Sequence, residues 1–189
     1  LGGNFNPVHL AHLVMADQVQ NQLGLDKVYL MPTYLPPHVD EKKTISSEHR
    51  LAMLELAVAD NPCLDIEPIE LIRKGKSYTY DTMKALKEAN PDTDYYFIIG
   101  GDMVEYLPKW HRIDDLLHLV QFVGIRRPNY PTESTYPIIW VDVPQMAISS
   151  TLIRQKVKSG CSTRYLLPEN VINYIQEKGL YQDELDNKL

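Results

Sequence analysis

The sequence predicts an α/β fold, a doubly wound parallel sheet with a small helical part at its C-terminal end. Short apolar runs of strand length alternate with segments whose apolar residues recur at helical spacing. The run at 95–99, Tyr-Tyr-Phe-Ile-Ile, is continuously apolar, as is typical of a parallel strand buried on both faces. Glycine pairs follow two of the expected strands, at 2–3 and 100–101. The alternation predicts right-handed crossovers and a Rossmann-like sheet that carries helices on both faces.

The expected elements follow from local patterns. Apolar Leu1 before the glycines indicates the cut end of a first strand, and further strands are expected at 28–31, 64–71, 95–99, 122–125 and 138–143. Pro68 limits the 64–71 strand to an edge or a bend. Helices are expected at about 10–23, 51–58, 81–89, 149–157 and 168–178, and Asn6-Pro7 fits the N-cap region of the first. We expect a single domain over 1–189, with a core at 1–147, a helical part at 148–182 and a flexible tail at 183–189.

Composition narrows the class of protein. A chain of 189 residues with 44% hydrophobic residues supplies one well-filled core, and a net charge of −6 argues against a large nucleic-acid surface. Cys63 and Cys161 lie outside any metal-ligand spacing, which suits a reduced cytosolic protein. No apolar run reaches membrane-spanning length and no leader pattern is present, so the expected location is the cytoplasm, with no membrane partner.

The segment 2–12, Gly-Gly-Asn-Phe-Asn-Pro-Val-His-Leu-Ala-His, is the first candidate site. Glycine tolerates close ligand approach, and His9 and His12, three residues apart, share one helix face near the positive end of the helix dipole, where an anion is stabilised. The competing interpretation is two polar residues at a helix start. The segment matches neither a Walker A loop nor G-x-G-x-x-G. A metal site of His9, His12 and His38 lacks a nearby acidic ligand.

A second candidate lies at 148–154, Ile-Ser-Ser-Thr-Leu-Ile-Arg. Hydroxyl side chains at a helix start are often only caps. Together with Arg154, however, they predict a second anion site, because free N–H groups, hydroxyls and a guanidinium converge there. Its importance depends on whether it meets the histidine segment.

Taken together, the two segments resemble the nucleotidyltransferase superfamily, with its (H/T)xGH and ISSTxxR signatures. The segments 36–38, 49–50, 77–82, 100–103 and 107–110 have counterparts in the bacterial nicotinate mononucleotide adenylyltransferase family, so the resemblance covers essentially the whole chain. It implies that AMP passes from ATP to nicotinate mononucleotide, giving deamido-NAD and pyrophosphate by direct in-line attack without a covalent intermediate.

The resemblance also implies site residues. It assigns catalytic contacts with the ATP phosphates to His9, His12 and Arg154. Further ATP contacts are implied for Gly2, Gly3, Phe5, Gly100, Asp102, Ile148, Ser149, Ser150 and Thr151, and acceptor contacts for Asn4, Arg50, Tyr78, Thr79 and Trp110. Mg²⁺ would be bound mainly through the ATP phosphates, without ligands from protein side chains.

Simpler roles compete for four of these residues. Asp102 and Thr79 suit helix N-caps, Trp110 suits a core position and Arg50 suits a solvated surface. ATP and nicotinate mononucleotide are the expected partners. The sequence does not decide between a homodimer and a monomer.

Several positions depart from the family pattern. Ala11 replaces the glycine of (H/T)xGH, Val39 stands where lysine is common, and His111 stands where tyrosine is frequent. Asn4 and Asn6 stand where threonine and aspartate are frequent. Alternative functions are adenylyl transfer to nicotinamide mononucleotide or phosphopantetheine, or nucleotide binding without catalysis. A metal-dependent phosphohydrolase would require clustered carboxylates.

Overall fold

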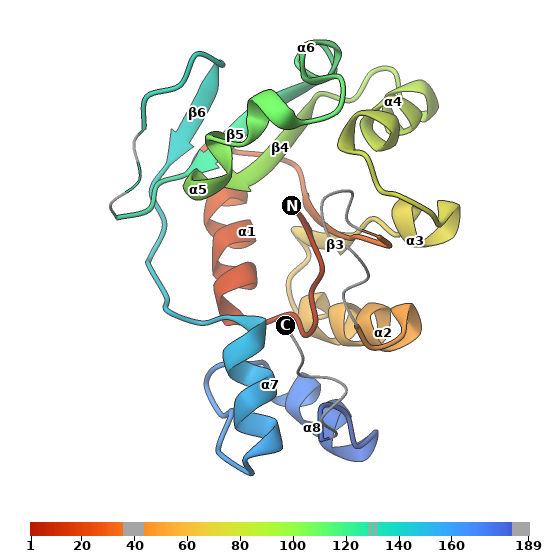
Figure 1. The fold of residues 1–189 in the computed structure, drawn as a ribbon, viewed down its shortest axis with the longest axis vertical. Helices are drawn as coiled ribbons and strands as arrows, with labels where there is room; N and C mark the ends of the chain where they lie inside the picture. Colours follow the sequence, from red (N-terminus) through yellow and green to blue (C-terminus); the bar gives the residue numbers. More distant parts are fainter. Residues whose placement is uncertain (36–43, 129, 131, 183–189) are drawn as a thin grey trace.

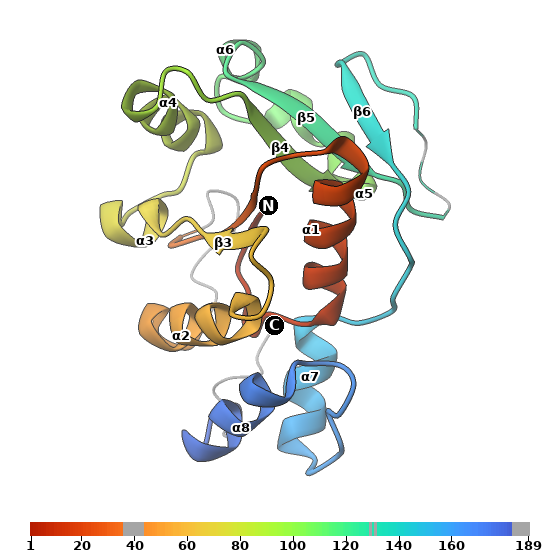
Figure 2. The ribbon, with the colours of Figure 1, turned by 180° about the vertical axis from the view of Figure 1, so that it is seen from behind.

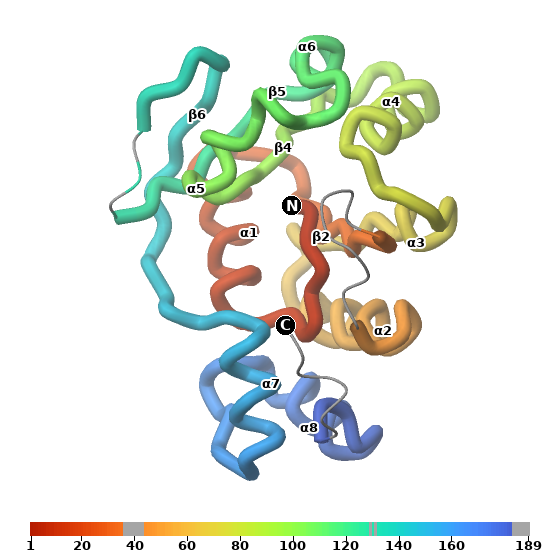
Figure 3. The backbone as a smooth tube through the Cα atoms, viewed as in Figure 1, coloured from red at the N-terminus to blue at the C-terminus, as the bar shows by residue number. Residues whose placement is uncertain are grey.

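Six parallel strands form the centre of the molecule (Figures 1 and 3). The computed structural model describes residues 1–35, 44–128, 130 and 132–182. Strands β1 (Gly2–Gly3), β2 (Val28–Pro32) and β3 (Leu64–Ile66) pair in that order, and β4 (Tyr95–Gly100), β5 (Val120–Ile125) and β6 (Ile138–Val141) form a second set. Because β1 lies beside β4, the spatial order is 3-2-1-4-5-6, the Rossmann order.

The predicted single sheet is therefore present as two hydrogen-bonded halves. All four strand pairs are parallel, with Val28 opposite Leu64 and Phe97 opposite Phe122. β1 contributes only two residues, and within the described residues its ladder joins β2 alone. Packing joins the halves instead, since a Cβ on Gly2 would lie 3.5 Å from the Phe97 ring of β4.

Helices surround the strands on both sides (Figure 2). The longer ones are α1 (Leu10–Leu23), α2 (Ser47–Val58), α4 (Thr79–Ala89), α7 (Ser150–Lys158) and α8 (Glu169–Glu177). Three short helices, α3 (Ile69–Arg73), α5 (Gly101–Val104) and α6 (Ile113–Leu116), and a 3₁₀ turn at Leu107–Lys109 complete the fold. Within the described ranges, no helix has the length and apolar character needed to span a membrane.

Successive strand residues bury their side chains on opposite faces. In β4, Ile98 joins the cluster that contains α1 and α2, whereas Phe97 and Ile99 join the cluster that contains α4, α5 and α6. The same alternation separates Leu30 from Met31 in β2. Side chains alternate in this way along any strand, so continuous apolar runs are needed where helices cover both faces. The doubly wound α/β fold predicted from the sequence is confirmed.

The C-terminal helices share the core of the sheet. Ile153 of α7 and Val171 and Ile175 of α8 belong to the same buried cluster as α1 and α2. The Asn170 amide also donates to the Leu56 carbonyl over 2.7 Å. A shared core of this kind is what one folded domain would require.

Two local predictions are wrong. The segment 64–71 is a strand only to Ile66, and α3 begins at Ile69 after Pro68, which has no backbone N–H to continue a ladder. Asn6-Pro7 is not the cap of α1, because His9 is the N-cap and the Asn6 side chain instead accepts a hydrogen bond from the buried Tyr181 hydroxyl over 2.8 Å. His38, Val39 and the tail at 183–189 lie outside the described residues.

Candidate functional site

The turn after β1 has a tightly specified backbone. Phe5 adopts a left-handed conformation with φ of +46°, and its ring is buried. A Cβ on Gly3 would lie 3.0 Å from that ring, so any larger residue would push the ring away from the strand end over which it folds back. The peptide bond between Asn6 and Pro7 is cis. The chain emerges from this turn directly into the two histidines.

His9 and His12 form a stacked pair at the start of α1. Their ring centroids are 3.6 Å apart, with an interplanar angle of 21°. The backbone N–H of His9 donates to Nδ1 of His12 over 3.2 Å, and the edge of the Phe5 ring contacts His12 with centroids 4.9 Å apart. Because Nδ1 of His12 accepts, the neutral ring carries its proton on Nε2.

Both imidazoles are held neutral by their surroundings. Burial lowers the pKa of His9 to about 4. Burial, followed by the adjacent His9, lowers the pKa of His12 to about 3. Nδ1 of His9 is buried without a hydrogen-bond partner among the described residues. Buried polar atoms of this kind are uncommon, which makes this imidazole a candidate for a functional role.

The α7 motif meets the histidine turn. The Ser150 hydroxyl donates to the Pro7 carbonyl over 2.8 Å, and the Arg154 guanidinium donates to the Asn6 carbonyl over 2.8 Å. Arg154 also donates to the Thr151 hydroxyl over 3.2 Å, while Ser149 caps α7 by accepting from the Leu152 N–H. Half-buried Ile148 packs against the core cluster. Segments more than 140 residues apart in the chain thus form one cationic, hydroxyl-rich site.

Arg50 is buried, so the alternative prediction that it is a solvated surface residue is wrong. Its exposed fraction is 1%, and its guanidinium donates to the carbonyl oxygens of Asn4 and Thr33, each over 2.9 Å. It also donates to the Asn4 side-chain oxygen and the Ser47 hydroxyl. Arg50 therefore fixes the turn after β1 against the end of β2. The contact between Arg50 and the acceptor, which the resemblance implies, stays a prediction.

The second glycine turn follows β4. A Cβ on Gly101 would lie 2.7 Å from the Ile125 carbonyl, so the backbone passes close to β5. Asp102 is the second residue of α5, and Gly100 occupies the cap, so the N-cap alternative for Asp102 is wrong. Its carboxylate lies 3.2 Å from Nε of Arg127.

Arg127 and Tyr181 were missed in the sequence. Arg127 follows the carboxyl end of β5, where ligands bind in open parallel sheets, and this position was a usable signal. Tyr181 anchors Asn6 from beyond α8, and no local pattern marks it.

Three of the predicted acceptor residues, Tyr78, Thr79 and Trp110, lie on the α4, α5 and α6 side. Tyr78 is the N-cap of α4 and Thr79 its first helical residue, so the N-cap alternative for Thr79 is wrong. Trp110 packs edge-on against Phe97 and Phe122, with centroids 5.9 and 6.0 Å apart. His111 contacts the Tyr78 ring at 4.7 Å, which joins the Trp110 segment to the start of α4.

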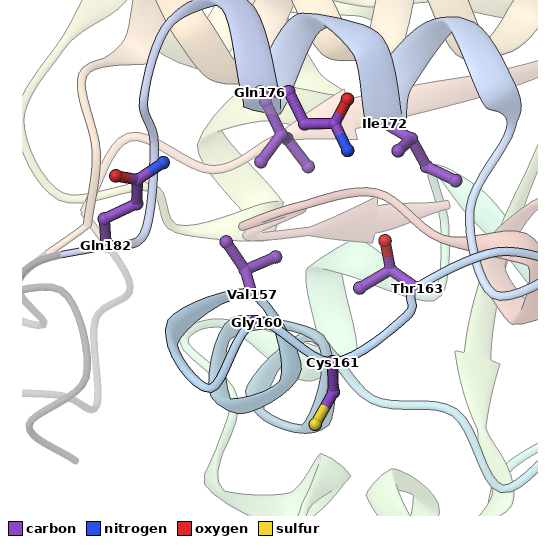
Figure 4. A pocket seen from close by; sticks show the side chains of 8 residues that line it. Val157, Gly160, Cys161, Thr163, Ile172, Gln176 and Gln182 are labelled. Carbon is purple, nitrogen blue, oxygen red and sulfur yellow. The ribbon is translucent and has the colours of Figure 1, made fainter.

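A cavity of about 170 Å³ lies elsewhere, between α7 and α8 (Figure 4). Its lining includes Val157, Thr163, Ile172 and Gln176, and none of the two motifs' site residues. Cys161 also borders it, and both Cys161 and Cys63 are free thiols. In the described part of the chain, no group of three or more His, Cys, Asp or Glu side chains is arranged to hold a metal ion.

Comparisons with known proteins identify the family of this chain. The cytidylyltransferase-like family matches residues 1–156. A Streptococcus pneumoniae protein named probable nicotinate-nucleotide adenylyltransferase is 64% identical over 181 residues, which is 96% of this chain and 87% of that protein. A Streptococcus mutans protein of the same name is 63% identical over 182 residues, with the same coverage.

Solved structures share the fold. Plasmodium falciparum nicotinic acid mononucleotide adenylyltransferase complexed with NaAD has a TM-score of 0.78 at 19% identity, covering 97% of this chain and 96% of that one. A putative nicotinate-nucleotide adenylyltransferase from Vibrio parahaemolyticus has a TM-score of 0.72 at 18% identity, covering 99% and 96%. With more than 60% identity to curated relatives over nearly its whole length, this chain belongs to the nicotinate-nucleotide adenylyltransferase family.

Proposed function

We propose that this protein transfers AMP from ATP to nicotinate mononucleotide, forming deamido-NAD and pyrophosphate in NAD biosynthesis. Family membership supports the reaction class and the acceptor. The single observation that supports it most is the contact between the two motifs, since α7 holds the turn that presents the stacked histidines. A phosphate-binding site built from both ends of the chain suits a triphosphate.

Adenylyl transfer requires the protein to position the substrates and to stabilise charge. A phosphate oxygen of the mononucleotide attacks the α-phosphorus of ATP, a new P–O bond forms, and the bond to the β-phosphate oxygen breaks as pyrophosphate leaves. No covalent enzyme intermediate is needed. The protein must hold two anions in line and stabilise the charge that develops on the phosphate oxygens.

His12 is proposed to donate from Nε2 to an α-phosphate oxygen. Its Nδ1 is already engaged by the His9 N–H, so the ring orientation and tautomer are fixed before substrate binds. A preorganised donor stabilises the transition state without reorganisation at the moment of reaction. His9 lies beside it and is proposed to contact a neighbouring phosphate oxygen.

Arg154 and the hydroxyls of α7 are proposed to hold the β- and γ-phosphates. The guanidinium lies against the histidine turn through the Asn6 carbonyl, so its charge is close to the stacked rings. Gly2, Gly3, Phe5 and Ile148 would shape the backbone around ATP. Gly100 and Asp102 would contact the nucleoside, with the Asp102 carboxylate accepting from both ribose hydroxyls.

The acceptor is proposed to lie between the turn after β1 and the start of α4. Asn4 and Arg50 would face its phosphate side, and Trp110 would lie against the pyridine ring. Tyr78 and Thr79 stand at the start of an eleven-residue helix, where backbone N–H groups favour a carboxylate over an amide.

Mg²⁺ is proposed to enter with ATP. The described residues offer no cluster of three metal-binding side chains, so the donor set fits an ion held by phosphate oxygens and water. When bound, the ion would neutralise charge on the leaving pyrophosphate. A cytoplasmic location and a homodimer stay predictions.

The test is a product assay. Purified protein is mixed with ATP and Mg²⁺ and, in separate reactions, nicotinate mononucleotide, nicotinamide mononucleotide or phosphopantetheine. Pyrophosphate and the dinucleotide or dephospho-coenzyme product are measured. Deamido-NAD formed faster than the other products supports the proposal. Product from phosphopantetheine alone, or ATP binding without product from any acceptor, would contradict it.

A further inference from the structure

Glu70 carries a buried carboxylate for which the proposed mechanism has no use. It lies on α3, and its exposed fraction is 3%. The Thr82 hydroxyl of α4 donates to Oε1 of Glu70 over 2.9 Å. The Ser77 side chain is a second neighbour that stabilises the charged form of this carboxylate. Burial raises the pKa of Glu70, while these two hydroxyls and the nearby Arg73 act in the opposite direction. A buried carboxylate is costly unless such contacts compensate it.

Ser77 extends this anchor to the end of β2. Its hydroxyl accepts from the backbone N–H of Tyr34 over 3.2 Å, and its own N–H donates to the Leu35 carbonyl over 2.9 Å. A serine hydroxyl has one proton and two lone pairs, so while it accepts from Tyr34 its proton stays available to the neighbouring Glu70 carboxylate. The loop after β2 and the segment before α4 are therefore joined through one side chain.

Thr82 extends the anchor to α4. It stands one turn after Thr79, on the same face of the helix. Besides its bond to Glu70, its hydroxyl accepts from the Arg73 guanidinium over 2.7 Å. The first turn of α4 is thus attached to α3 by side chains as well as by the chain.

The connection between α3 and α4 needs such an anchor. Lys74 and Gly75 both have left-handed backbones, with φ of +59° and +75°. A left-handed conformation is strained for lysine and persists only where the surrounding structure imposes it. The connecting segment 74–78 is short and turns sharply, so its path depends on the contacts that Ser77 makes.

We propose that Glu70 is a positioning residue for the acceptor, holding the Tyr78–Thr79 start of α4 in place through Ser77 and Thr82. This inference rests on the proposed function, which places the pyridine carboxylate at that turn. Glu70 acts through its neighbours and does not touch the substrate. A shift of about 1 Å in a binding group can reduce its effect about a hundredfold, so loss of the anchor should weaken the acceptor site more than the ATP site.

Kinetics of Glu70→Ala, Glu70→Gln and the control Glu88→Gln test the proposal. Glu88 is an exposed residue of α4 that pairs with Lys84, away from Ser77 and Thr82. Glu70→Ala should raise KM for nicotinate mononucleotide at least tenfold and KM for ATP less than twofold. Glu70→Gln keeps one acceptor oxygen and should lie between the alanine variant and wild type. Glu88→Gln should match wild type.

An unchanged acceptor KM in folded Glu70→Ala, or an equal rise in both KM values, would overturn the proposal. If Glu70→Ala does not fold, Ser77→Ala and Glu70→Gln carry the same comparison. Hydrogen exchange of backbone amides 76–82 gives a readout that needs no turnover. Faster exchange there in the Glu70 variants, with α1 unchanged, supports the anchor even if wild-type enzyme makes no deamido-NAD; unchanged exchange at 76–82 contradicts it.

Discussion

The backbone N–H of His9 donates to Nδ1 of His12 over 3.2 Å, so one histidine of the signature fixes the tautomer of the other. Their spacing of three residues is what permits this, because the N-cap N–H and the third helical residue face each other across the first turn. The result is an Nε2–H donor whose direction is set before any nucleotide binds.

Replacing His12 should lower turnover more than ATP affinity. His12→Ala should reduce kcat about 10²–10³-fold, the usual effect of removing one donor to transition-state charge, with KM for ATP changed little. His12→Gln keeps a donor near the position of Nε2 and should retain more activity than His12→Asn, which mimics only Nδ1. His118→Gln, an exposed control, should match wild type. Turnover near wild type in His12→Ala would show that His12 only positions substrate.

The histidine pair should also make stability depend on pH. In the unfolded chain both rings titrate near 6.5, whereas in the folded protein the pKa values are about 4 and 3. Stability is therefore fully present above pH 6.5 and is lost as pH falls toward the folded pKa values, because the unfolded state takes up protons first. From pH 7.5 to 5.5 the loss should be about 1.4 kcal/mol for each ring.

Urea unfolding of wild type and of His9→Gln/His12→Gln at both pH values checks this linkage. The other histidines contribute equally to both proteins and cancel. Between pH 7.5 and 5.5, the free energy of unfolding should fall by about 1–3 kcal/mol more in wild type than in the double variant. Equal losses would show that the imidazoles titrate normally in the folded protein.

Arg50 should be a large contributor to stability. Arg50→Met removes its hydrogen bonds to the carbonyls of Asn4 and Thr33 while keeping most of the apolar stem. The free energy of unfolding should fall by about 2–4 kcal/mol, because buried acceptors lose charged donors. Arg164→Met, at an exposed residue that contacts the Tyr165 ring, should change it by less than about 0.5 kcal/mol. Chemical unfolding of both variants measures these changes. A similar loss of unfolding free energy in Arg50→Met and Arg164→Met would contradict the anchoring role of Arg50.

Gly101 should tolerate a methyl group less well than Gly2. A Cβ on Gly101 would lie 2.7 Å from the Ile125 carbonyl, which is backbone and cannot rotate away. Gly101→Ala should cost about 1–3 kcal/mol and displace Asp102, raising KM for ATP. A Cβ on Gly2 would meet the Phe97 ring at an ordinary 3.5 Å, so Gly2→Ala should cost less than about 1 kcal/mol. The opposite order in urea unfolding would show that the β4 turn shifts freely.

Local patterns predicted most elements closely. The helix expected at 10–23 is α1 at Leu10–Leu23, and the strand expected at 95–99 is β4 at Tyr95–Gly100. Apolar periodicity reports burial directly, so long periodic segments are readable without a structure. The failure at 64–71 has the same origin, because a short apolar run fits a strand or a helix equally, and Pro68 decided between them.

Some residues of the candidate site could be identified from the sequence, whereas others could be identified only from the structure. Sequence motifs alone identified the histidine pair, the α7 hydroxyls and Arg154, because residue types and spacing define those signatures. They also misjudged Arg50, whose burial depends on carbonyl oxygens contributed by two separate loops. Arg127 and Tyr181 acquire their roles only from partners about 25 and 175 residues away.

By itself the sequence determined the α/β class, the order of the main elements and the two candidate anion-binding motifs, since these depend on local spacing and hydrophobic period. The tertiary structure alone decided that α7 donates to the histidine turn, that Arg50 is an internal anchor and that the buried Glu70 carboxylate accepts from Thr82 of α4. The physical reason is the same in each case. A buried polar group must find a partner, and which distant segment supplies that partner is settled only when the chain packs.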